Sequence, residues 1–301
     1  MNRLSKNISA NFLSNVWSAV LILTLTPLYI NFLGIESYGL IGFYISWLAL
    51  LGILDNGISA TASREIAWLS ARTNERKKIP NLIRTLEVMY WGIVLIIGVV
   101  ILVGIMLFGS NWFQSDNLDS VLIQDALILM AISLVLQVPS GLYIGGLMGL
   151  QRQVECSALV ALFGTIRGVG SILVLWLVSP DIKTYFLWNI VASGMQTGII
   201  RSVLWRKINV TQCTASFSIE ILHSVKMFAG GMMLITALAL IMGYADKIIL
   251  SRLISLEMFG YYMLAWAVAS ILGRISTPLI QAIGPYFTEL VSTKNEEVIS
   301  K

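Results

Sequence analysis

The chain has 301 residues, of which 57% are hydrophobic and only 12% charged, and its formal net charge is +4. Soluble domains are about a quarter charged and less than half apolar, so this composition excludes a soluble globular protein. A basic chain can bind nucleic acid. Here, however, the basic residues group in short segments between apolar runs, which indicates a membrane protein with no nucleic-acid partner.

Apolar runs of about 20 residues or more, long enough to cross a bilayer as helices, follow one another along the chain. The alternating pattern typical of barrel strands is absent. We therefore predict an all-α polytopic membrane protein with about eight transmembrane helices, at residues 9–32, 38–60, 82–109, 122–149, 156–178, 184–204, 221–245 and 257–284.

The first predicted span follows Arg3 and Lys6 and is too long for a signal-peptide core, so we interpret it as an uncleaved membrane helix. It carries Asn11, Asn15 and Ser18 at intervals of four and three residues. This spacing places three polar side chains on one helix face, as suits a bundle interior or a water-filled cleft. Asn11 and Asn15 are therefore candidate substrate-binding residues.

The second predicted span contains Asp55, in the sequence LLGILDNGISA, and Arg64 follows nine residues later. Asp55 is a candidate to neutralise a membrane arginine, to carry a proton or to contact a substrate. The alternative is an ordinary helix-end residue near the membrane surface. Arg64 marks the exit from the membrane and is a candidate gating residue at the mouth of an inner cavity.

Basic residues are distributed unequally between the two predicted sides of the membrane. With the N-terminus inside, fifteen fall on inner segments and three on outer ones, which predicts that both termini are cytoplasmic. The loop 72–78, RTNERKK, is then an anchor beside anionic headgroups. The largest outer loop, near 110–121, is too short to fold as a catalytic domain. The inner residues are Arg3, Lys6, Arg64, Arg72, Arg76, Lys77, Lys78, Arg84, Arg152, Arg201, Arg206, Lys207, Lys226, Lys294 and Lys301, and the outer residues are Lys183, Lys247 and Arg252.

Proline and glycine residues punctuate the predicted spans. Each proline removes a helical hydrogen bond and tends to kink its helix, which predicts either ordinary bending or bending during transport. Three glycines near the end of the fourth span predict a close approach between helices. The prolines are Pro27, Pro139, Pro278 and Pro285, and the glycines are Gly145, Gly146 and Gly149.

Two arginines fall deep within predicted spans, where a charged side chain usually faces a cavity or a partner. Arg167 lies eleven residues into the fifth span, or about 16 Å, which is near the bilayer midplane. Arg274 lies seventeen residues into the eighth span, or about 25 Å from its outer end. We predict that both bind substrate in a central cavity. Structural pairing is the alternative for Arg167, and reaching the inner surface is the alternative for Arg274.

Asp246 and Lys247 are adjacent near the outer end of the seventh predicted span. Neighbouring helix residues point in different directions, so we predict that they do not pair directly. One would face the cavity while the other meets headgroups. Both are candidate gating or coupling residues.

Sequence signatures of catalysis are missing. There is no GxxxxGK[ST] phosphate loop, no Ser/His/Asp set, no HExxH and no acidic metal cluster. Cys156 and Cys213 are predicted to be reduced and unpaired in cytoplasmic loops, and the one histidine, His223, is predicted at a helix start near the membrane surface. We therefore predict a protein that is not an enzyme and has no catalytic residue, cofactor or metal. Ion gradients, the membrane potential or the substrate gradient would supply transport energy.

Two segments of the chain repeat one pattern. Residues 33–43 read LGIESYGLIGF and residues 254–264 read ISLEMFGYYML, so that Glu36 aligns with Glu257 and Gly39 with Gly260, 221 residues apart. This repeat predicts two related halves. We place a six-helix bundle at residues 1–210. An incomplete second bundle, two helices and the start of a cytoplasmic loop, occupies 211–301.

The repeated segments and their surroundings resemble the polysaccharide-transporter flippases, in particular the O-antigen flippases (Wzx). These share a superfamily with the MATE multidrug/sodium antiporters and the lipid II flippases. The resemblance covers nearly the whole chain. It is carried by ANFLSNVWSAV, PLYINFLGIESYGLIGFYISW and LDNGISATASREIA in the first half, and by YADKIILSRLISLEMFGYYMLAWAVAS and PLIQAIGPYFTEL in the second.

The resemblance implies two six-helix bundles facing each other across a V-shaped cavity. Family members have a complete second bundle, so the chain is expected to be a fragment, a truncated reading frame or a degenerate copy. The implied function is flipping of an undecaprenyl-diphosphate-linked oligosaccharide across the bacterial inner membrane, in lipopolysaccharide or other polysaccharide biosynthesis. Membrane lipids and other glycan-assembly proteins are the implied partners.

Two other functions are open on the sequence. A cation-coupled multidrug exporter of the MATE type would need a cavity dominated by carboxylates. Asp55 alone supports this weakly, and two deep arginines argue against it. A glycan polymerase or ligase would need a sizeable outer loop with acid/base residues, and loop 110–121 is too short for that.

Overall fold

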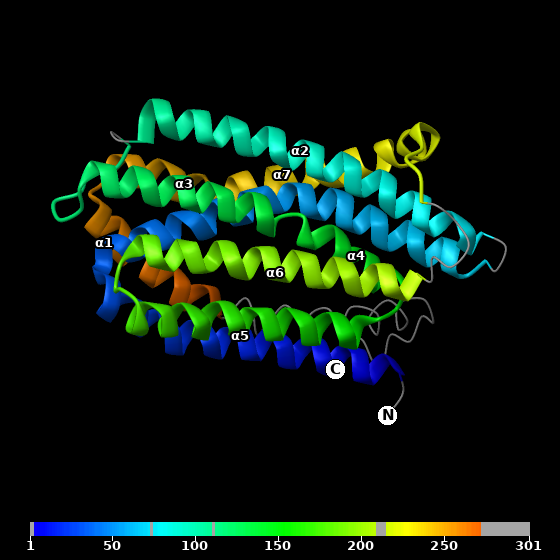
Figure 1. Cartoon of the computed structure of the whole chain (residues 1–301), viewed down its shortest axis with the longest axis horizontal. Helices are drawn as coiled ribbons and strands as arrows, with labels where there is room; N and C mark the ends of the chain where they lie inside the picture. Colours follow the sequence, from blue (N-terminus) through cyan, green and yellow to red (C-terminus); the bar gives the residue numbers. More distant parts are fainter. Residues whose placement is uncertain (1–2, 73–74, 110–111, 209–214, 272–301) are drawn as a thin grey trace, which may run out of the picture.

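A computed structural model of the chain describes residues 3–72, 75–109, 112–208 and 215–271. This part consists of long helices joined by short loops, with one isolated backbone bridge between Gln114 and Ser255. The helices lie side by side along one long axis (Figure 1). This arrangement satisfies backbone hydrogen bonds within each segment, as a bilayer requires.

Helix α1 (Arg3–Ser70) contains the first two predicted spans. The chain breaks at Gly34, whose φ of 78° and ψ of 166° favour glycine, and reverses direction there (Figure 1). Pro27 lies inside the continuous helix, so the break comes at the glycine and not at the proline. The second half of α1 continues past the predicted end at residue 60, because Ala62, Ile66 and Leu69 are buried in the core.

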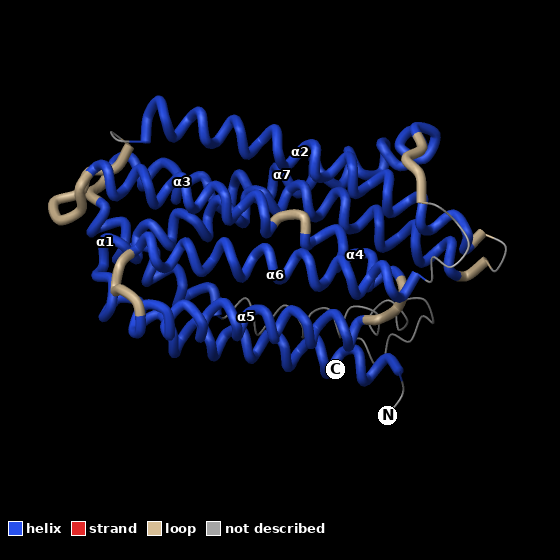
Figure 2. Tube along the Cα trace, in the orientation of Figure 1, coloured by secondary structure: helices blue, strands red, loops and turns tan. Residues whose placement is uncertain are grey.

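The next helices follow the predicted order. A short 3-10 turn, η1 (Arg76–Lys78), leads into α2 (Ile79–Phe108). The fourth predicted span is two helices, α3 (Ser120–Gln137) and α4 (Ser140–Gly149), separated by a break before Ser140 that Figure 2 shows within the bundle. Pro139 stands at this break, as predicted. Then come α5 (Gln153–Leu177), α6 (Ile182–Ile208), α7 (Ile219–Leu253) and the apolar helix Leu256–Ile271.

Within the described ranges these segments occupy all eight predicted spans, the eighth in part, which confirms an all-α polytopic membrane protein. Five stretches are long and apolar enough to cross a membrane by length and composition: Asn11–Ser70, Arg76–Phe108, Ser120–Gly149, Gln153–Leu177 and Leu234–Leu253. Helix α6 is not among them. Its buried side carries polar residues, Asn189, Ser193, Gln196 and Thr197. Exposed apolar side chains such as Leu107 and Met242 lie where lipid would lie.

The two ends of the bundle differ in charge. One end contains residues 71–72 and 75–78, the turn 150–152 and the C-terminus of α6. Its basic residues are Arg72, Arg76, Lys77, Lys78, Arg152, Arg206 and Lys207. We call it the basic end. The other, which we call the opposite end, carries Gly34 and the loops 112–119 and 178–181. Each end has its own apolar core. One is built around Tyr38, Met130, Phe186 and Phe259, and the other around Ile66, Leu86, Leu142 and Leu204.

The two repeated segments contact each other at the opposite end. A Cβ atom added to Gly39 would lie 3.0 Å from the carbonyl oxygen of Leu256 and 3.4 Å from the amide nitrogen of Gly260. A Cβ added to Gly260 would in turn meet the carbonyl oxygen of Ile35. The contact is therefore reciprocal, and the aligned glycines permit it because neither has a side chain.

The loop after α2 adds to this contact. Glu36 is buried and accepts hydrogen bonds from Ser115 Oγ at 2.6 Å and Asn117 Nδ2 at 3.0 Å. The Leu256 amide donates to the Gln114 carbonyl oxygen at 2.7 Å. One loop thus joins both repeated segments and closes the opposite end of the bundle.

Helix α4 packs closely on the second half of α1, as its glycines predict. A Cβ on Gly145 would meet the backbone of Ser59, and one on Gly149 would meet the backbone of Ser63. On the other face, a Cβ on Gly146 would meet Leu204 of α6. Small residues thus let α4 lie between α1 and α6.

Candidate anion-binding cavity

A cavity of about 420 Å³ lies in the middle of the bundle. Its wall is mostly apolar, with hydroxyl groups, aromatic rings and one charged side chain, Arg167. The described lining residues come from α1, α5, α6, the end of α3 and the helix 256–271: Ser18, Leu21, Ile22, Leu25, Thr26, Tyr29, Tyr38, Ile41, Ile45, Gln137, Gly164, Arg167, Gly168, Tyr185, Trp266, Ala267 and Ser270.

Arg167 is held in this wall by neutral groups. Its Nη2 donates to Gln196 Oε1 at 2.6 Å and to Ser193 Oγ at 3.4 Å. Its Nε is buried without a hydrogen-bond partner. Among the described residues no carboxylate forms an ion pair with this guanidinium. The side chain is therefore fixed in position without a carboxylate partner among the described residues, which makes it a candidate binding group for an anion.

A chain of hydroxyl groups extends from Arg167 across the bundle. Ser193 Oγ lies 3.3 Å from Ser133 Oγ, which lies 3.2 Å from the Tyr44 hydroxyl. Tyr44 in turn donates to Gln137 Oε1, a cavity-lining group, at 2.5 Å. Helices α1, α3, α5 and α6 are thus linked behind the cavity wall, and the links orient the two polar side chains that face it.

Aromatic residues form the cavity wall nearest the opposite end. The Tyr29 hydroxyl lies 2.6 Å from Ser171 Oγ and donates to the Gly168 carbonyl oxygen at 3.2 Å. The Tyr29 and Tyr185 rings meet edge to face with centroids 5.4 Å apart. Ordered aromatic faces and one cation give this part of the cavity an amphipathic surface.

Asp55 lies away from this cavity lining. The Tyr90 hydroxyl donates to Asp55 Oδ1 and also lies 3.2 Å from the Val138 carbonyl oxygen. Gly141 of α4 leaves the space that the Asp55 carboxyl occupies. In the described structure Asp55 therefore joins α1, α2 and the break between α3 and α4, and it neutralises no arginine there. A role in substrate binding stays a prediction.

The polar stripe of the first span divides between cavity and surface. Ser18 lines the cavity, whereas Asn15 Nδ2 donates to the Asn11 carbonyl oxygen at 2.9 Å within the same helix. Neither asparagine is among the described lining residues. Arg64 is exposed toward the basic end of α1. The proposed roles of Asn11, Asn15 and Arg64 stay predictions.

The prediction that Asp246 and Lys247 do not pair is wrong. Lys247 Nζ lies 3.0 Å from Asp246 Oδ2 and donates to the Gly243 carbonyl oxygen at 3.1 Å. The long lysine side chain curls back, so that the ammonium reaches its neighbour although the two Cβ atoms point apart. It is buried against the rings of Tyr244 and Trp266, with Nζ 5.0 and 4.9 Å from their centroids. Trp266 also lines the cavity, so the pair contacts the cavity wall from behind.

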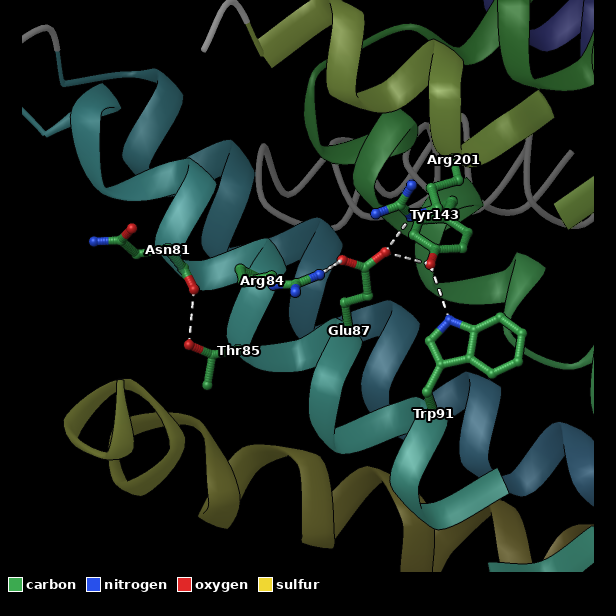
Figure 3. Close-up of polar contacts among 7 residues, drawn as sticks. All are labelled: Asn81, Arg84, Thr85, Glu87, Trp91, Tyr143 and Arg201. Carbon is green, nitrogen blue, oxygen red and sulfur yellow. Dashed lines mark hydrogen bonds and ion pairs between the residues drawn. The ribbon is translucent and has the colours of Figure 1, made fainter. Parts of the chain in front are cut away.

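A second polar cluster, which the sequence reasoning missed, surrounds Glu87 of α2 (Figure 3). Glu87 is 4% exposed; its Oε2 pairs with Arg84 Nη1 at 3.0 Å and its Oε1 with Arg201 Nε. The Tyr143 hydroxyl donates to Glu87 Oε1 at 2.7 Å and accepts from Trp91 Nε1 at 3.1 Å. The available signal was an acidic residue inside the third predicted span, with arginines at the inner ends of two spans.

Some predicted residues cannot be placed. Arg274, Pro278, Pro285 and Cys213 lie outside the described residues, as does the side chain of His223, which belongs to the second turn of α7. Cys156 is free, but the prediction that it lies in a loop is wrong, because it is buried in α5. Among the described residues no group of three or more His, Cys, Asp or Glu side chains is arranged to hold a metal ion.

Comparison with known proteins identifies the family of this chain. A family model described as "Polysaccharide biosynthesis protein" matches residues 4–291. A solved structure of a multidrug resistance MATE family transporter of the MOP superfamily, in an inward-facing conformation, is similar with a TM-score of 0.67 at 15% identity. The match covers 90% of this chain and 63% of that one. A search of the curated proteins found no match.

A second solved structure is a MOP superfamily transporter from Pyrococcus furiosus, whose binding pocket is described as having reverse polarity. It matches with a TM-score of 0.53 at 14% identity, over 97% of this chain and 68% of that one. The chain thus spans about two thirds of the length of these transporters. Identities this low show the fold alone. The chain is a member of the polysaccharide biosynthesis protein family with the multi-pass helical fold of the MOP-superfamily transporters.

Proposed function

We propose that the protein takes part in flipping a polyprenyl-diphosphate-linked oligosaccharide, such as an O-antigen repeat unit on undecaprenyl diphosphate, across the bacterial inner membrane. The observation that carries the proposal is the charge of the cavity. Among its described lining residues the single ionisable side chain with a full charge is Arg167, and no carboxylate pairs with it. A diphosphate needs such a cationic group to leave the interface.

The expected transport path uses both the cationic and the aromatic parts of the cavity wall. The diphosphate would bind Arg167, the sugars would cross in the wet cavity against the tyrosine and tryptophan rings, and the polyprenyl tail would stay in lipid. Arg274 would add a second cation from the second of two related bundles, at residues 1–210 and 211–301. An interior-negative potential would favour outward movement of the anion by about 2.3 kcal/mol per charge per 100 mV.

The orientation follows from the charged ends. We infer that the basic end is cytoplasmic, with both termini inside. The contact between the repeated segments then closes the periplasmic end. The described state would be the one that receives substrate from the cytoplasmic leaflet. Lys247 and Asp246, behind Trp266, are candidates for coupling to ion movement.

Replacement of Arg167 tests the proposal. We expect Arg167→Ala to abolish surface glycan when the protein, with any continuation of its reading frame, replaces the flippase of a deletion strain. Arg167→Lys should restore part of it, because lysine keeps the charge and loses the planar fork. Arg206→Ala, which removes an exposed arginine at the basic end, is the matched control. Normal glycan with Arg167→Ala would remove Arg167 from the mechanism.

The second candidate is a cation-coupled multidrug exporter, favoured by the likeness to the multidrug MATE structure. It would need a carboxylate facing the cavity to attract cations, and the described lining offers none. Efflux of cationic dyes from a sensitised strain separates the two functions. Efflux that survives Arg167→Ala would support the exporter and contradict the flippase.

A further inference from the structure

A second cavity lies at the basic end, away from Arg167. Its volume is about 310 Å³. Three cations line it, each from a different element: Arg76 of η1, Arg152 of the turn between α4 and α5, and Lys207 near the end of α6. Elements far apart in sequence thus place their positive charges around one space.

Local structure holds Arg76 and the backbone of Arg152 in place. Arg76 Nε donates to the carbonyl oxygen of Ser70, the last residue of α1, at 2.9 Å. Gln151 has a left-handed backbone with φ of 60°, which is uncommon for a residue other than glycine and marks a site where the fold imposes a particular direction. The Arg152 amide, directly after it, donates to the Leu147 carbonyl oxygen at 3.0 Å.

The cations exceed the carboxylates around this cavity. Glu155 pairs with Arg152 at 3.0 Å and with Lys207 at 3.2 Å, so one negative charge is shared by two cations. Among the described residues Arg76 forms no ion pair. Three cations against one carboxylate leave two positive charges, the complement of a headgroup with one or two phosphates.

The rest of the wall indicates a lipid as the source of that phosphate. Besides Ser70, the other lining residues are apolar: Ile79, Leu150 and Ile208. The cavity lies where spanning helices end, the position at which headgroups are expected, and basic pockets between helix ends bind anionic headgroups.

We propose that this cavity binds the phosphate-bearing headgroup of an anionic phospholipid. The site is separate from the transport cavity, so the proposal stands or falls without the flippase proposal. It also differs from a general attraction of the basic loop to the membrane, because only three of the basic residues at this end line the cavity.

Two triple variants of equal charge test this inference. Arg76→Ala, Arg152→Ala and Lys207→Ala together remove the cavity cations. Arg72→Ala, Lys77→Ala and Lys78→Ala together remove three exposed cations at the same end. Purified protein in neutral detergent is titrated with phosphatidylglycerol or cardiolipin, and bound lipid is counted by native mass spectrometry. Each cation that contacts the headgroup contributes about a five-fold change in affinity. The cavity variant should therefore lose about 100-fold, and the control much less because its three cations do not line the cavity.

Further measurements distinguish a lipid headgroup from free phosphate and control for misfolded variants. Phosphatidylcholine should not bind, and inorganic phosphate or pyrophosphate alone should not displace the anionic lipid. Each variant is compared by the rise in its own thermal midpoint on adding lipid, and Arg76→Gln alone serves if the triple variant is unstable. Equal losses in both triple variants would overturn the proposal. Displacement of the lipid by free phosphate would instead assign the cavity to a soluble anion.

Discussion

The arginines of the Glu87 cluster and Arg167 differ in whether a carboxylate pairs with them. Arg84 and Arg201 share the buried carboxylate of Glu87, which also accepts from Tyr143. Arg167 donates to an amide oxygen and a serine hydroxyl of α6, has a buried Nε without a partner and faces a cavity. In the Glu87 cluster each arginine has a carboxylate partner within the fold. At Arg167 the fold positions a guanidinium that has no carboxylate partner among the described residues.

The presence or absence of a carboxylate partner indicates which charged residues of a membrane helix bundle are candidates for function. A charged residue in a span is costly whether it is structural or functional, so its presence alone does not separate the two roles. The partner separates them. A paired arginine joins helices, whereas an arginine that donates only to neutral acceptors is a candidate to bind an anionic ligand. The predictions below test this distinction.

The largest expected effect on stability is at Glu87. Glu87→Ala leaves Arg84, Arg201 and the Tyr143 hydroxyl without their common acceptor. Because the arginine side chains are 44% and 45% exposed and can regain water, we expect a loss of about 2–3 kcal/mol, below that of a fully buried pair. Arg167→Met should change stability by less than about 1 kcal/mol. Thermal unfolding in detergent measures both.

Glu155→Ala is the control for this comparison, because it removes a half-exposed carboxylate that also pairs with two cations. Exposed pairs contribute little, so about 0–1 kcal/mol is expected. If Arg167→Met proves as destabilising as Glu87→Ala, Arg167 is a structural residue and the comparison fails.

Most of the spans, their helical nature and the short loops could be predicted from the length of the apolar runs. Helix α6 also forms where predicted, although its polar buried side keeps it below the length-and-composition criterion. Pro139 and the α4 glycines also acted as expected, since backbone geometry and side-chain volume are local properties. The extension of α1 to Ser70 was not predictable from hydropathy. Residues 61–70 are polar enough to end a span, and only burial of Ile66 and Leu69 in the tertiary core keeps them helical.

Depth along a helix can be predicted from sequence, but pairing cannot. Arg167 was placed at mid-span by counting residues, and it does line a cavity. The Asp246–Lys247 pair was missed because Cβ directions were used for a side chain long enough to curl back. The Glu87 cluster was missed because it joins residues 56 and 114 positions apart, and a single sequence does not show which helix faces lie together.

The next largest effect is expected at Tyr143, whose hydroxyl donates to a carboxylate. A hydrogen bond to a charged group contributes about 1.5–3 kcal/mol, so Tyr143→Phe should lose about 1.5 kcal/mol. Tyr261→Phe, a half-exposed tyrosine on the outer surface, is the matched control and should be neutral. Chemical unfolding monitored by tryptophan fluorescence gives both values. A neutral Tyr143→Phe would mean that Glu87 is satisfied by its arginines alone.

Gln196→Glu converts the Arg167 region into a copy of the Glu87 cluster. The new carboxylate replaces the amide oxygen that lies 2.6 Å from Arg167 Nη2, so the guanidinium gains an internal counter-ion. We expect stability to be kept and binding of a lipid diphosphate to fall about ten-fold, or about 1.4 kcal/mol. Gln153→Glu adds the same charge at the start of α5 as a control. Unchanged diphosphate binding in Gln196→Glu would show that Arg167 is not the anion site.

The smallest effect is expected at Tyr44, the neutral counterpart of Tyr143. Its hydroxyl donates to Gln137 at 2.5 Å and lies 3.2 Å from Ser133, and a neutral hydrogen bond contributes about 1 kcal/mol. Tyr44→Phe should therefore lose about 1 kcal/mol, less than Tyr143→Phe in the same unfolding assay. It should also weaken diphosphate binding slightly, because Ser133 and Ser193 connect Tyr44 to Arg167. Ser46→Ala, which removes a hydroxyl bonded only to its own helix in the described structure, should leave binding unchanged. Equal losses of stability for Tyr44→Phe and Tyr143→Phe would contradict the comparison. They would mean that a hydrogen bond to the Glu87 carboxylate stabilises the fold no more than one to the neutral Gln137 amide.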